Sequence, residues 1–174
     1  MKQDNYAPFV ERGKLVDDCS QGLLLELKGI PFAKQSFRYQ AFVPKGKKFA
    51  IVHKYQPKKV IEGENTLRAQ IIAELPKGFS PFTKAVVVRA IKFIFPLPKS
   101  AKKKTLDLVN RGMTVYKISK PDLTDNLMKG LFDAMKGIVF HDDSQVALIC
   151  NVSKIYGKTP GIQILLDEIE SELS

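Results

Sequence analysis

The sequence contains no tryptophan, only two cysteines and only two histidines among its 174 residues. Cys19 and Cys150 lie far apart and form no Cys-x-x-Cys or Cys/His cluster, so neither a zinc site nor a disulfide framework is expected. His53 and His141 have no second histidine at metal-ligand spacing and are expected to be structural, although His141, beside Asp142, could reach a site through a water molecule. Such sparing use of cysteine favours a reducing, cytoplasmic compartment.

Long apolar runs are also missing. No stretch approaches the length of a membrane span, and the first 18 residues are polar and lack the apolar region of a signal peptide. Hydrophobic residues make up 44% of the chain and charged residues 26%, which is typical of a globular protein of one domain. We therefore expect neither a membrane partner nor a small-molecule cofactor.

Acidic residues are scarce in the first two thirds of the chain. Residues 1–120 contain 24 Lys and Arg against 9 Asp and Glu, whereas residues 121–174 contain 4 against 9. The net charge of +10 is thus divided into a basic body of +15 and an acidic end of −5. This distribution suits a protein that neutralises phosphates with its cations and holds a divalent cation with its carboxylates. Charge alone leaves open a protein that is simply basic.

The apolar pattern predicts an α+β fold in a single domain. The β-branched and aromatic run AVVVRAIKFIF favours a central, buried strand, and Leu127, Met128, Leu131, Phe132 and Met135 form one helical stripe. We expect a mixed four-stranded sheet in β-α-β-α-β-β order, with helices packed on it. The expected parts are an N-terminal arm (1–21) and the domain (22–174), with strands at 22–29, 85–95, 146–152 and 162–169, helices at 61–75 and 125–136, a loop or irregular hairpin at 30–55, and a short helix and extended piece (114–118) between 99 and 121.

The segment 120–146 concentrates acidic side chains around the second predicted helix. Asp125 lies in its first turn, with Lys129 and Asp133 one and two turns further along the same face. A helix start and the next strand entry can meet at one end of a sheet, so Asp122, Asp125 and Asp143 are expected to converge. Convergent carboxylates repel one another unless a hard cation neutralises them. Mg²⁺ bound there could activate a water molecule against a phosphodiester.

Each of these residues also has an ordinary structural explanation. Asp122 could be a helix N-cap, and Asp125 could interact with the helix macrodipole. Surface ion pairs would explain Lys129 and its two acidic neighbours, and Asp142–Asp143 could form a turn. On that alternative the protein is a structural basic protein, and the grouping of the acidic residues is a coincidence.

The order of residues in this segment resembles the RusA-type Holliday junction resolvases of bacteria and prophages. That family has Asp, one residue, Asp-Asn-Leu, one residue, Lys, then a helix with a Phe-Asp pair, a Gly, and Asp-Asp, one residue, Gln-Val. The resemblance is specific over 120–165, weaker over 22–119 and absent before residue 22. This chain matches with Asp122, Asp125-Asn126-Leu127, Lys129, Phe132-Asp133, Gly137, Asp142-Asp143, Gln145-Val146, and a tail of Lys154, Gly157 and Gly161.

The resemblance implies a homodimer that cuts four-way DNA junctions symmetrically with Mg²⁺, or with Mn²⁺ in its place, in DNA recombination and repair. It implies a bacterial or prophage protein of the cytoplasm and nucleoid. Asp122, Asp125 and Asp143 would be catalytic and metal-binding carboxylates, Lys129 the catalytic lysine, and Asp142 a further metal ligand. Asn126 would orient the helix start, and Asp133 would lie on the helix surface or behind the site.

One departure from the family concerns the first aspartate. The family separates its first two aspartates by one residue, whereas Leu123 and Thr124 stand between Asp122 and Asp125 here. Asp122 therefore needs a one-residue bulge in the backbone to serve as a catalytic and metal-binding carboxylate. This departure keeps open a protein that binds DNA junctions without cutting them. A nuclease acting on other branched DNA, such as flaps or forks, is a further alternative.

Basic residues outside the acidic segment are candidates for DNA contact. The cluster closest in sequence to the acidic segment is the one most expected to lie along a DNA strand. Arg38, between Phe37 and Tyr39, combines a cation with two aromatic rings that could stack on unpaired bases, unless the rings belong to the core. Lysine runs can equally be solvated surface. The lysines of the first cluster are Lys99, Lys102, Lys103 and Lys104; the other two clusters are Lys45, Lys47 and Lys48, and Lys54, Lys58 and Lys59.

Overall fold

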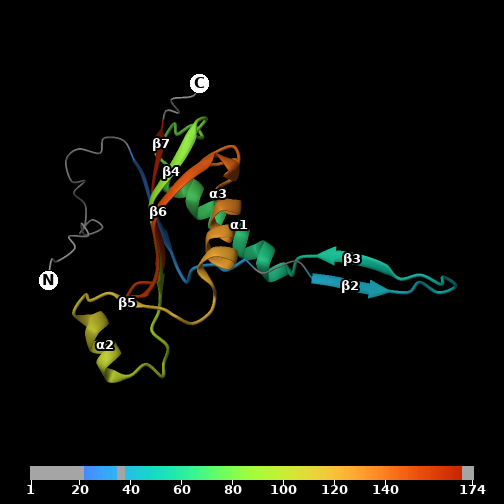
Figure 1. The fold of residues 1–174 in the computed structure, drawn as a ribbon, viewed down its shortest axis with the longest axis horizontal. Helices are drawn as coiled ribbons and strands as arrows, with labels where there is room; N and C mark the ends of the chain where they lie inside the picture. Colours follow the sequence, from blue (N-terminus) through green and yellow to red (C-terminus); the bar gives the residue numbers. More distant parts are fainter. Residues whose placement is uncertain (1–21, 35–37, 170–174) are drawn as a thin grey trace.

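The computed structural model describes residues 22–34 and 38–169 (Figure 1). The predicted N-terminal arm, with Cys19, and the predicted stacking residue Phe37 lie outside the described residues. Within them, no helix is both long enough and apolar enough to cross a membrane.

A mixed sheet of five strands forms the centre of the body, in the order β1–β7–β4–β6–β5. The central strand β4 pairs antiparallel with β7 and parallel with β6, as expected for its continuous apolar sequence. The strands of this sheet are β1 (Leu23–Lys28), β4 (Ala85–Phe95), β5 (Val115–Tyr116), β6 (Val146–Tyr156) and β7 (Gly161–Ile169).

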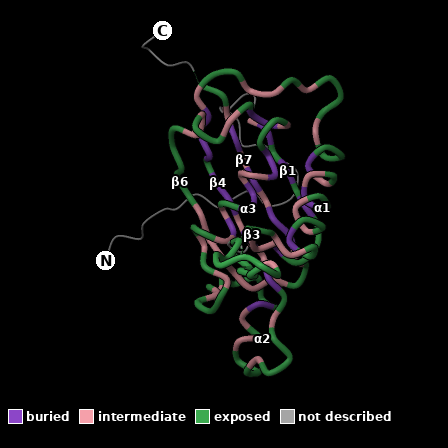
Figure 2. The backbone as a smooth tube through the Cα atoms, turned by 90° about the vertical axis from the view of Figure 1, so that its right-hand side faces the viewer, coloured by how far each residue is buried: buried purple, intermediate pink, exposed green. Residues whose placement is uncertain are grey.

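Two helices cover one face of the sheet (Figures 1 and 2). They are α1 (Lys58–Glu74) and α3 (Lys129–Met135), and α3 continues a π-helical segment, η1 (Leu123–Met128). The core is one cluster between helices and sheet, and Figure 2 shows its buried positions along the strands behind the helices. Both helices and the strands β1, β4 and β7 supply fully buried side chains, so their apolar patterns are satisfied by one core. Examples are Leu25, Ile71, Phe93, Leu131 and Ile164.

The prediction of an α+β fold with a mixed sheet is confirmed, but the number of strands was wrong. The sheet has five strands because Val115–Tyr116 pairs with Tyr156 and Ile155 at the end of β6. The sequence pattern predicts an extended piece there. A strand of two residues is too short to show the alternation of apolar and polar side chains that would assign it to a sheet. The predicted order also did not count the strands β2 (Arg38–Phe42) and β3 (Ile51–Tyr55) or the helix α2 (Lys103–Asn110), although a loop or irregular hairpin and a short helix were expected at these places.

A two-stranded hairpin extends from the body where the sequence suggested a loop or irregular hairpin (Figure 1). It consists of β2 (Arg38–Phe42) and β3 (Ile51–Tyr55), paired antiparallel in a sheet of their own. No residue from Arg38 to Tyr55 is buried, so for Tyr39 the alternative of a core residue does not hold. We call residues 38–55 the β2–β3 arm.

The segment that leads from β1 toward this arm is fixed across both helices. Phe32 packs on Gly63 of α1, where a Cβ atom would come within 2.4 Å of its ring. Lys34 packs on Gly130 of α3, where a Cβ atom would lie 3.1 Å from the lysine Cβ. The backbone N–H of Lys34 also donates to Asn126 O at 3.0 Å. Glycine at these two helix positions lets the segment approach the helix backbones closely.

Candidate active site

The first acidic group lies at the start of the helix η1–α3. Asp122 is the N-cap, and its carboxylate accepts the backbone N–H of Asn126 at 3.0 Å and a hydrogen bond from the Asn126 side chain. Asn126 thus orients the helix start. Asp122 makes the contacts of a helix N-cap, as its ordinary structural explanation predicted. Asp125 and Lys129 are both exposed along the helix that follows, so their polar groups are accessible from solvent.

The extra residue between Asp122 and Asp125 coincides with an irregularity of the helix. Residues 123–128 are π-helical, and the backbone N–H of Lys129 donates to Thr124 O, five residues earlier. A π-turn accommodates one residue more than an α-turn, and such turns are frequent at functional sites. The one-residue bulge required by the sequence is therefore present in the backbone.

Two lysines hold the backbone that precedes Asp122. Lys154, near the end of β6, donates to the carbonyl oxygens of Ser119, at 2.8 Å, and Pro121. Lys117 donates to the same Ser119 carbonyl and lies 5.2 Å from the centre of the Phe95 ring. The start of the helix is consequently tied to the last residues of β4 and β6.

The second acidic group lies at the other end of the helix. Asp142 pairs with Lys136, the residue that ends α3, and Asp143 lies 3.6 Å from the same ammonium group. The hydrogen bond from Lys136, with that from the Ser144 backbone, holds the pKa of Asp142 well below its usual range. Hydrogen bonding to Asp142 also raises the pKa of Lys136. Both groups are therefore charged over the whole neutral range.

Gln145 fixes this second group to the sheet. Its side chain accepts the backbone N–H of Asp142 at 2.9 Å, which completes a capping box for the short helix η2 (Asp143–Gln145). The same amide donates to Phe82 O and Lys84 O, both at 3.0 Å, just before β4. Asp142 and Asp143 are thereby positioned at the entry of β6.

The two acidic groups are therefore separated by the length of the helix, contrary to the expected convergence within one chain. The six residues of η1 and seven of α3 extend for about 20 Å at 1.5 Å per residue. The reason is the short connection from α3 to β6, which makes helix and strand run in opposite directions. The start of the helix thus lies by the end of β6, where Lys154 contacts Pro121, and not by its beginning.

Among the described residues, no group of three or more His, Cys, Asp or Glu side chains could hold a metal ion. The carboxylates are nevertheless hard oxygen donors of the kind that Mg²⁺ and Mn²⁺ prefer, and Asp122, Asp125 and Asp143 are exposed. The donor chemistry fits a divalent cation, but the arrangement within one chain supplies too few of these donors at one place.

Asp133 does not pair with Lys129 but with Lys34. The ammonium group of Lys34 lies 2.8 Å from Asp133 and 2.9 Å from Glu64 of α1, and its side chain is only 15% exposed. Burial alone would lower the pKa of Lys34, but the hydrogen bonds to these two carboxylates raise it above its ordinary value. Asp133 thus serves to hold the helix α3 against α1 and the segment before the arm.

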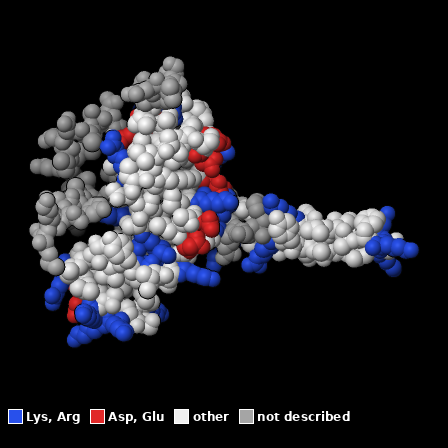
Figure 3. Space-filling model, in the orientation of Figure 1, with Lys and Arg blue, Asp and Glu red and all other residues white. Residues whose placement is uncertain are grey.

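The predicted DNA-binding lysines lie around the helix α2. Lys102 is its N-cap and Lys103 and Lys104 form its first turn, while Lys99 precedes it; all four are exposed. Figure 3 shows basic side chains over α2 and at the tip of the β2–β3 arm, and acidic side chains over the region of α3. Arg38 begins β2 and is also exposed. On the face shown, the acidic side chains therefore gather near α3, away from the basic side chains at α2 and at the tip of the arm.

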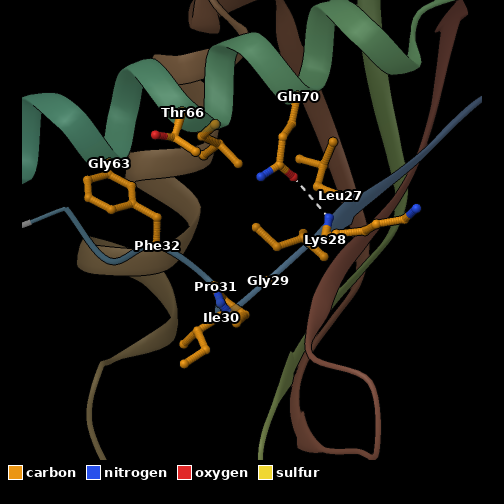
Figure 4. Close-up of a pocket in the computed structure, with 11 residues that line it drawn as sticks. Leu27, Lys28, Gly29, Ile30, Pro31, Phe32, Gly63, Thr66 and Gln70 are labelled. Atoms are coloured by element: carbon orange, nitrogen blue, oxygen red, sulfur yellow. Dashed lines mark hydrogen bonds between the residues drawn. The ribbon is translucent and has the colours of Figure 1, made fainter.

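The pocket in Figure 4 lies between α1 and the end of β1, and no carboxylate lines it. Gln70 crosses it to accept the backbone N–H of Lys28 at 2.9 Å. Its other walls are mainly apolar, formed by Leu27, Ile30, Pro31 and Phe32. The pocket therefore offers no group for phosphodiester chemistry.

Comparison with known proteins bears directly on this arrangement. The family model described as Endodeoxyribonuclease RusA matches residues 30–167. The chain belongs to the RusA endodeoxyribonuclease family. The match includes the helix start with Asp122, Asp125 and Lys129 and the pair Asp142–Asp143, so both acidic groups lie in the RusA-like part of the chain.

A curated relative is the uncharacterized protein YqaN of Bacillus subtilis (strain 168), which is 34% identical over 83 residues. The matched region covers 47% of this chain and 56% of YqaN, so it spans little more than half of the relative. Its description assigns it no activity.

Two residues that position the RusA-like segment were given no role by the sequence predictions. Gln145, which matches the family motif, had a usable signal for its role, because Asp142 and Gln145 are spaced as a capping box. Arg68 of α1 had none: its guanidinium donates to the carbonyl oxygens of Asp133, Ala134 and Lys136 and so caps the end of α3. Contacts of this kind join residues about 65 positions apart and depend on the packing of the two helices.

Proposed function

We propose that this chain is a homodimeric, Mg²⁺-dependent endonuclease that makes paired cuts in four-way DNA junctions, with Mn²⁺ as a possible substitute. The observation that carries the proposal is the RusA family match over a helix start that presents Asp122, Asp125 and Lys129 to solvent. The basic surface supports DNA as the partner. Recombination and repair are the processes that need such cuts.

The catalytic carboxylates would be supplied by two subunits. Asp122 and Asp125 lie about one helix length from Asp143 in the same chain, so a site with all three requires a second copy. A homodimer with two-fold symmetry would form two such sites, each with the helix start of one subunit and Asp142–Asp143 of the other. A bound divalent cation would there supply an activated water and charge stabilisation at the phosphate.

The edge of β6 supports this dimer. β5 and Lys117 occupy its outer edge only from Lys154 to Tyr156, so among the described residues the edge from Val146 to Ser153 has no partner strand. Leu148 is 52% exposed and Ile149 37%. A long, partly apolar edge favours pairing with another strand. Pairing β6 antiparallel with its copy would bring the start of each β6, with Asp143, beside the end of the other.

The register that achieves this places Ala147 opposite Ser153 of the second copy, the last residue of the unpaired edge, and therefore Cys150 opposite its own counterpart. Facing residues of antiparallel strands have Cα atoms about 4.5–5.5 Å apart, which is within the range of a disulfide. In the Cys19→Ser variant, mild oxidation should then produce a covalent dimer through Cys150. A dimer in solution that never cross-links would contradict this register.

The other residues would act on the DNA itself. Lys129, the residue that directly follows the π-helical segment, would stabilise charge on the scissile phosphate. The lysines around α2 would hold the phosphate backbone, because Lys102, Lys103 and Lys104 add their charge to the positive end of a helix dipole. Arg38 would contact DNA from the base of the β2–β3 arm.

The proposal is tested with a synthetic mobile four-way junction and a matched linear duplex, each incubated with the protein in Mg²⁺ and in EDTA. Paired, Mg²⁺-dependent nicks on the junction alone support it, and Asp143→Asn should abolish the nicks while junction binding is kept. Nicks on flaps or forks in preference to junctions would assign a different branched substrate. Tight junction binding without any nicks would make the chain a junction-binding protein. Equal binding and cutting of junction and duplex would exclude both a junction-cutting enzyme and a junction-binding protein.

A further inference from the structure

The β2–β3 arm has the composition of a surface that binds a polyanion. Between Arg38 and Tyr55 the sequence contains five cationic side chains and no carboxylate. Three of them, Lys45, Lys47 and Lys48, are exposed at the turn that joins the strands. Figure 3 shows basic side chains at the tip of the arm. A partner that neutralises this charge must itself carry closely spaced negative charges.

Large apolar side chains are exposed among these cations. Tyr39 is 66% exposed, Phe42 50% and Phe49 60%, and Val43 and Val52 are each 62% exposed. The ammonium group of Lys47 lies 5.8 Å from the centre of the Phe49 ring, so cation and aromatic are presented together. A two-stranded hairpin without a core gains little stability in water, and contiguous exposed apolar groups mark an interaction surface.

The arm is anchored beside the candidate active site. The segment before it is hydrogen-bonded through Lys34 to Asn126, the neighbour of Asp125, and ion-paired to Asp133 on the same helix. From the segment fixed through Lys34, each five-residue strand of the arm extends for about 17 Å. This length exceeds the width of the DNA major groove, about 12 Å, so the arm is long enough to reach across a groove. A ligand bound along the arm would therefore pass close to the start of η1.

We infer that the β2–β3 arm is a DNA-binding ribbon that recognises the branch point, an inference that rests on the proposed function. Its tip lysines bind the phosphates of a DNA arm, and Phe42 and Phe49 stack on bases that are exposed where the strands exchange. Aromatic side chains stack on any unpaired base, and apolar side chains inserted between base steps stabilise opened DNA. A duplex offers phosphates to the lysines but no open base step to the phenylalanines.

The charge part is tested by fluorescence anisotropy in EDTA, with a labelled four-way junction and a matched duplex over a range of salt concentrations. Lys47→Glu with Lys48→Glu should weaken binding to both DNAs by more than about tenfold and reduce the slope of log K against log salt by about 2. The control Lys28→Glu with Lys77→Glu changes the charge equally on the exposed surface of the body and should stay within about twofold of wild type.

The stacking part is tested with Phe42→Ala and Phe49→Ala together. This variant should lose more than about tenfold in affinity for the junction and less than about threefold for the duplex. Its thermal unfolding should match wild type, because neither ring belongs to the core. Equal losses on both DNAs, or none, would overturn the stacking role.

The outcomes separate this inference from the proposed function. If wild type cuts junctions and the lysine variant binds them like its control, the arm is not a DNA-binding element, although the nuclease proposal stands. If binding depends on the arm but no Mg²⁺-dependent cutting occurs, the nuclease proposal fails and the arm inference stands. If the phenylalanine variant instead dissociates a dimer in sedimentation velocity, the arm is a contact between copies and the inference is overturned.

Discussion

The two ends of the helix η1–α3 carry the same kind of side chain in different states. At the start, Asp122 is engaged by the helix backbone and Asn126, while Asp125 is exposed. At the other end, Asp142 and Asp143 share the ammonium group of Lys136. A rigid helix keeps these groups about 20 Å apart. The comparison teaches that residues close together in a sequence motif can lie at opposite ends of one helix, and on the proposed function each end is a half-site that a second subunit would complete.

The largest expected effect comes from neutralising one carboxylate at each end. Asp125→Asn and Asp143→Asn should each reduce junction cleavage by at least about 10³-fold, because on the proposed function each would remove a ligand of the divalent cation. Mixing the two inactive variants should restore cleavage. With free subunit exchange, half of the dimers would be mixed and one of the two sites in each would be intact, giving about a quarter of the wild-type nicking rate.

The mixing experiment tests directly whether the two ends of the helix η1–α3 belong to sites shared between subunits. The control is a mixture of Asp125→Asn with Asp122→Asn, whose substitutions fall at the same end of the helix and should not complement. Restored nicking in this control, or none in the first mixture after exchange has been shown by mass spectrometry, would mean that the sites are not shared.

Lys129→Ala should have the next largest effect. Loss of one positioned cation near the phosphate should slow cleavage by about 10²-fold and change junction affinity by less than about threefold. Single-turnover cleavage at saturating protein measures the first quantity and anisotropy the second. Lys77→Ala, an exposed lysine in the turn after α1, is the matched control. Similar losses in both variants would show that Lys129 has no special role in cleavage.

Lys34→Met should affect stability, because it leaves Glu64 and Asp133 without their shared cation. We expect the free energy of unfolding in urea to fall by about 1–3 kcal/mol at pH 7. The pKa of Lys34 is raised in the folded state, so its contribution is complete below the ordinary lysine pKa of about 10.4 and is lost as pH rises through the folded value. The difference between variant and wild type should therefore shrink as the pH is raised through the folded pKa of Lys34. An effect that is constant with pH would point to lost packing instead of lost charge.

Lys136→Ala should have the smallest effect, because its ion pairs are exposed. The melting temperature at pH 7 should fall by less than about 2 °C. The lowered pKa of Asp142 contributes stability above the ordinary value of about 3.9, and this is lost as pH falls through the folded pKa. Variant and wild type should consequently differ least in strong acid, measured by circular dichroism. A larger difference at low pH than at neutral pH would contradict this linkage.

Much of the fold was predictable because its periodic segments are long. The apolar run from Ala85 to Phe95 and the stripe of the second helix identify their elements wherever they pack. The short strand Val115–Tyr116 and the arm were less predictable, since two residues have no period and an arm without buried positions has no apolar alternation. The π-turn was signalled only as an extra residue, Leu123 or Thr124, in a familiar motif.

The sequence by itself determined the α+β class, the central strand, the family motif and the identity of the candidate carboxylates, because these depend on residue type and local spacing. Only the tertiary structure decided where the carboxylates lie. A short connection after α3 reverses the chain into β6, so Asp122 and Asp143 are at opposite ends of one helix. The local spacing of residues does not predict this reversal, because the direction of a strand relative to a helix is decided by packing against the whole sheet.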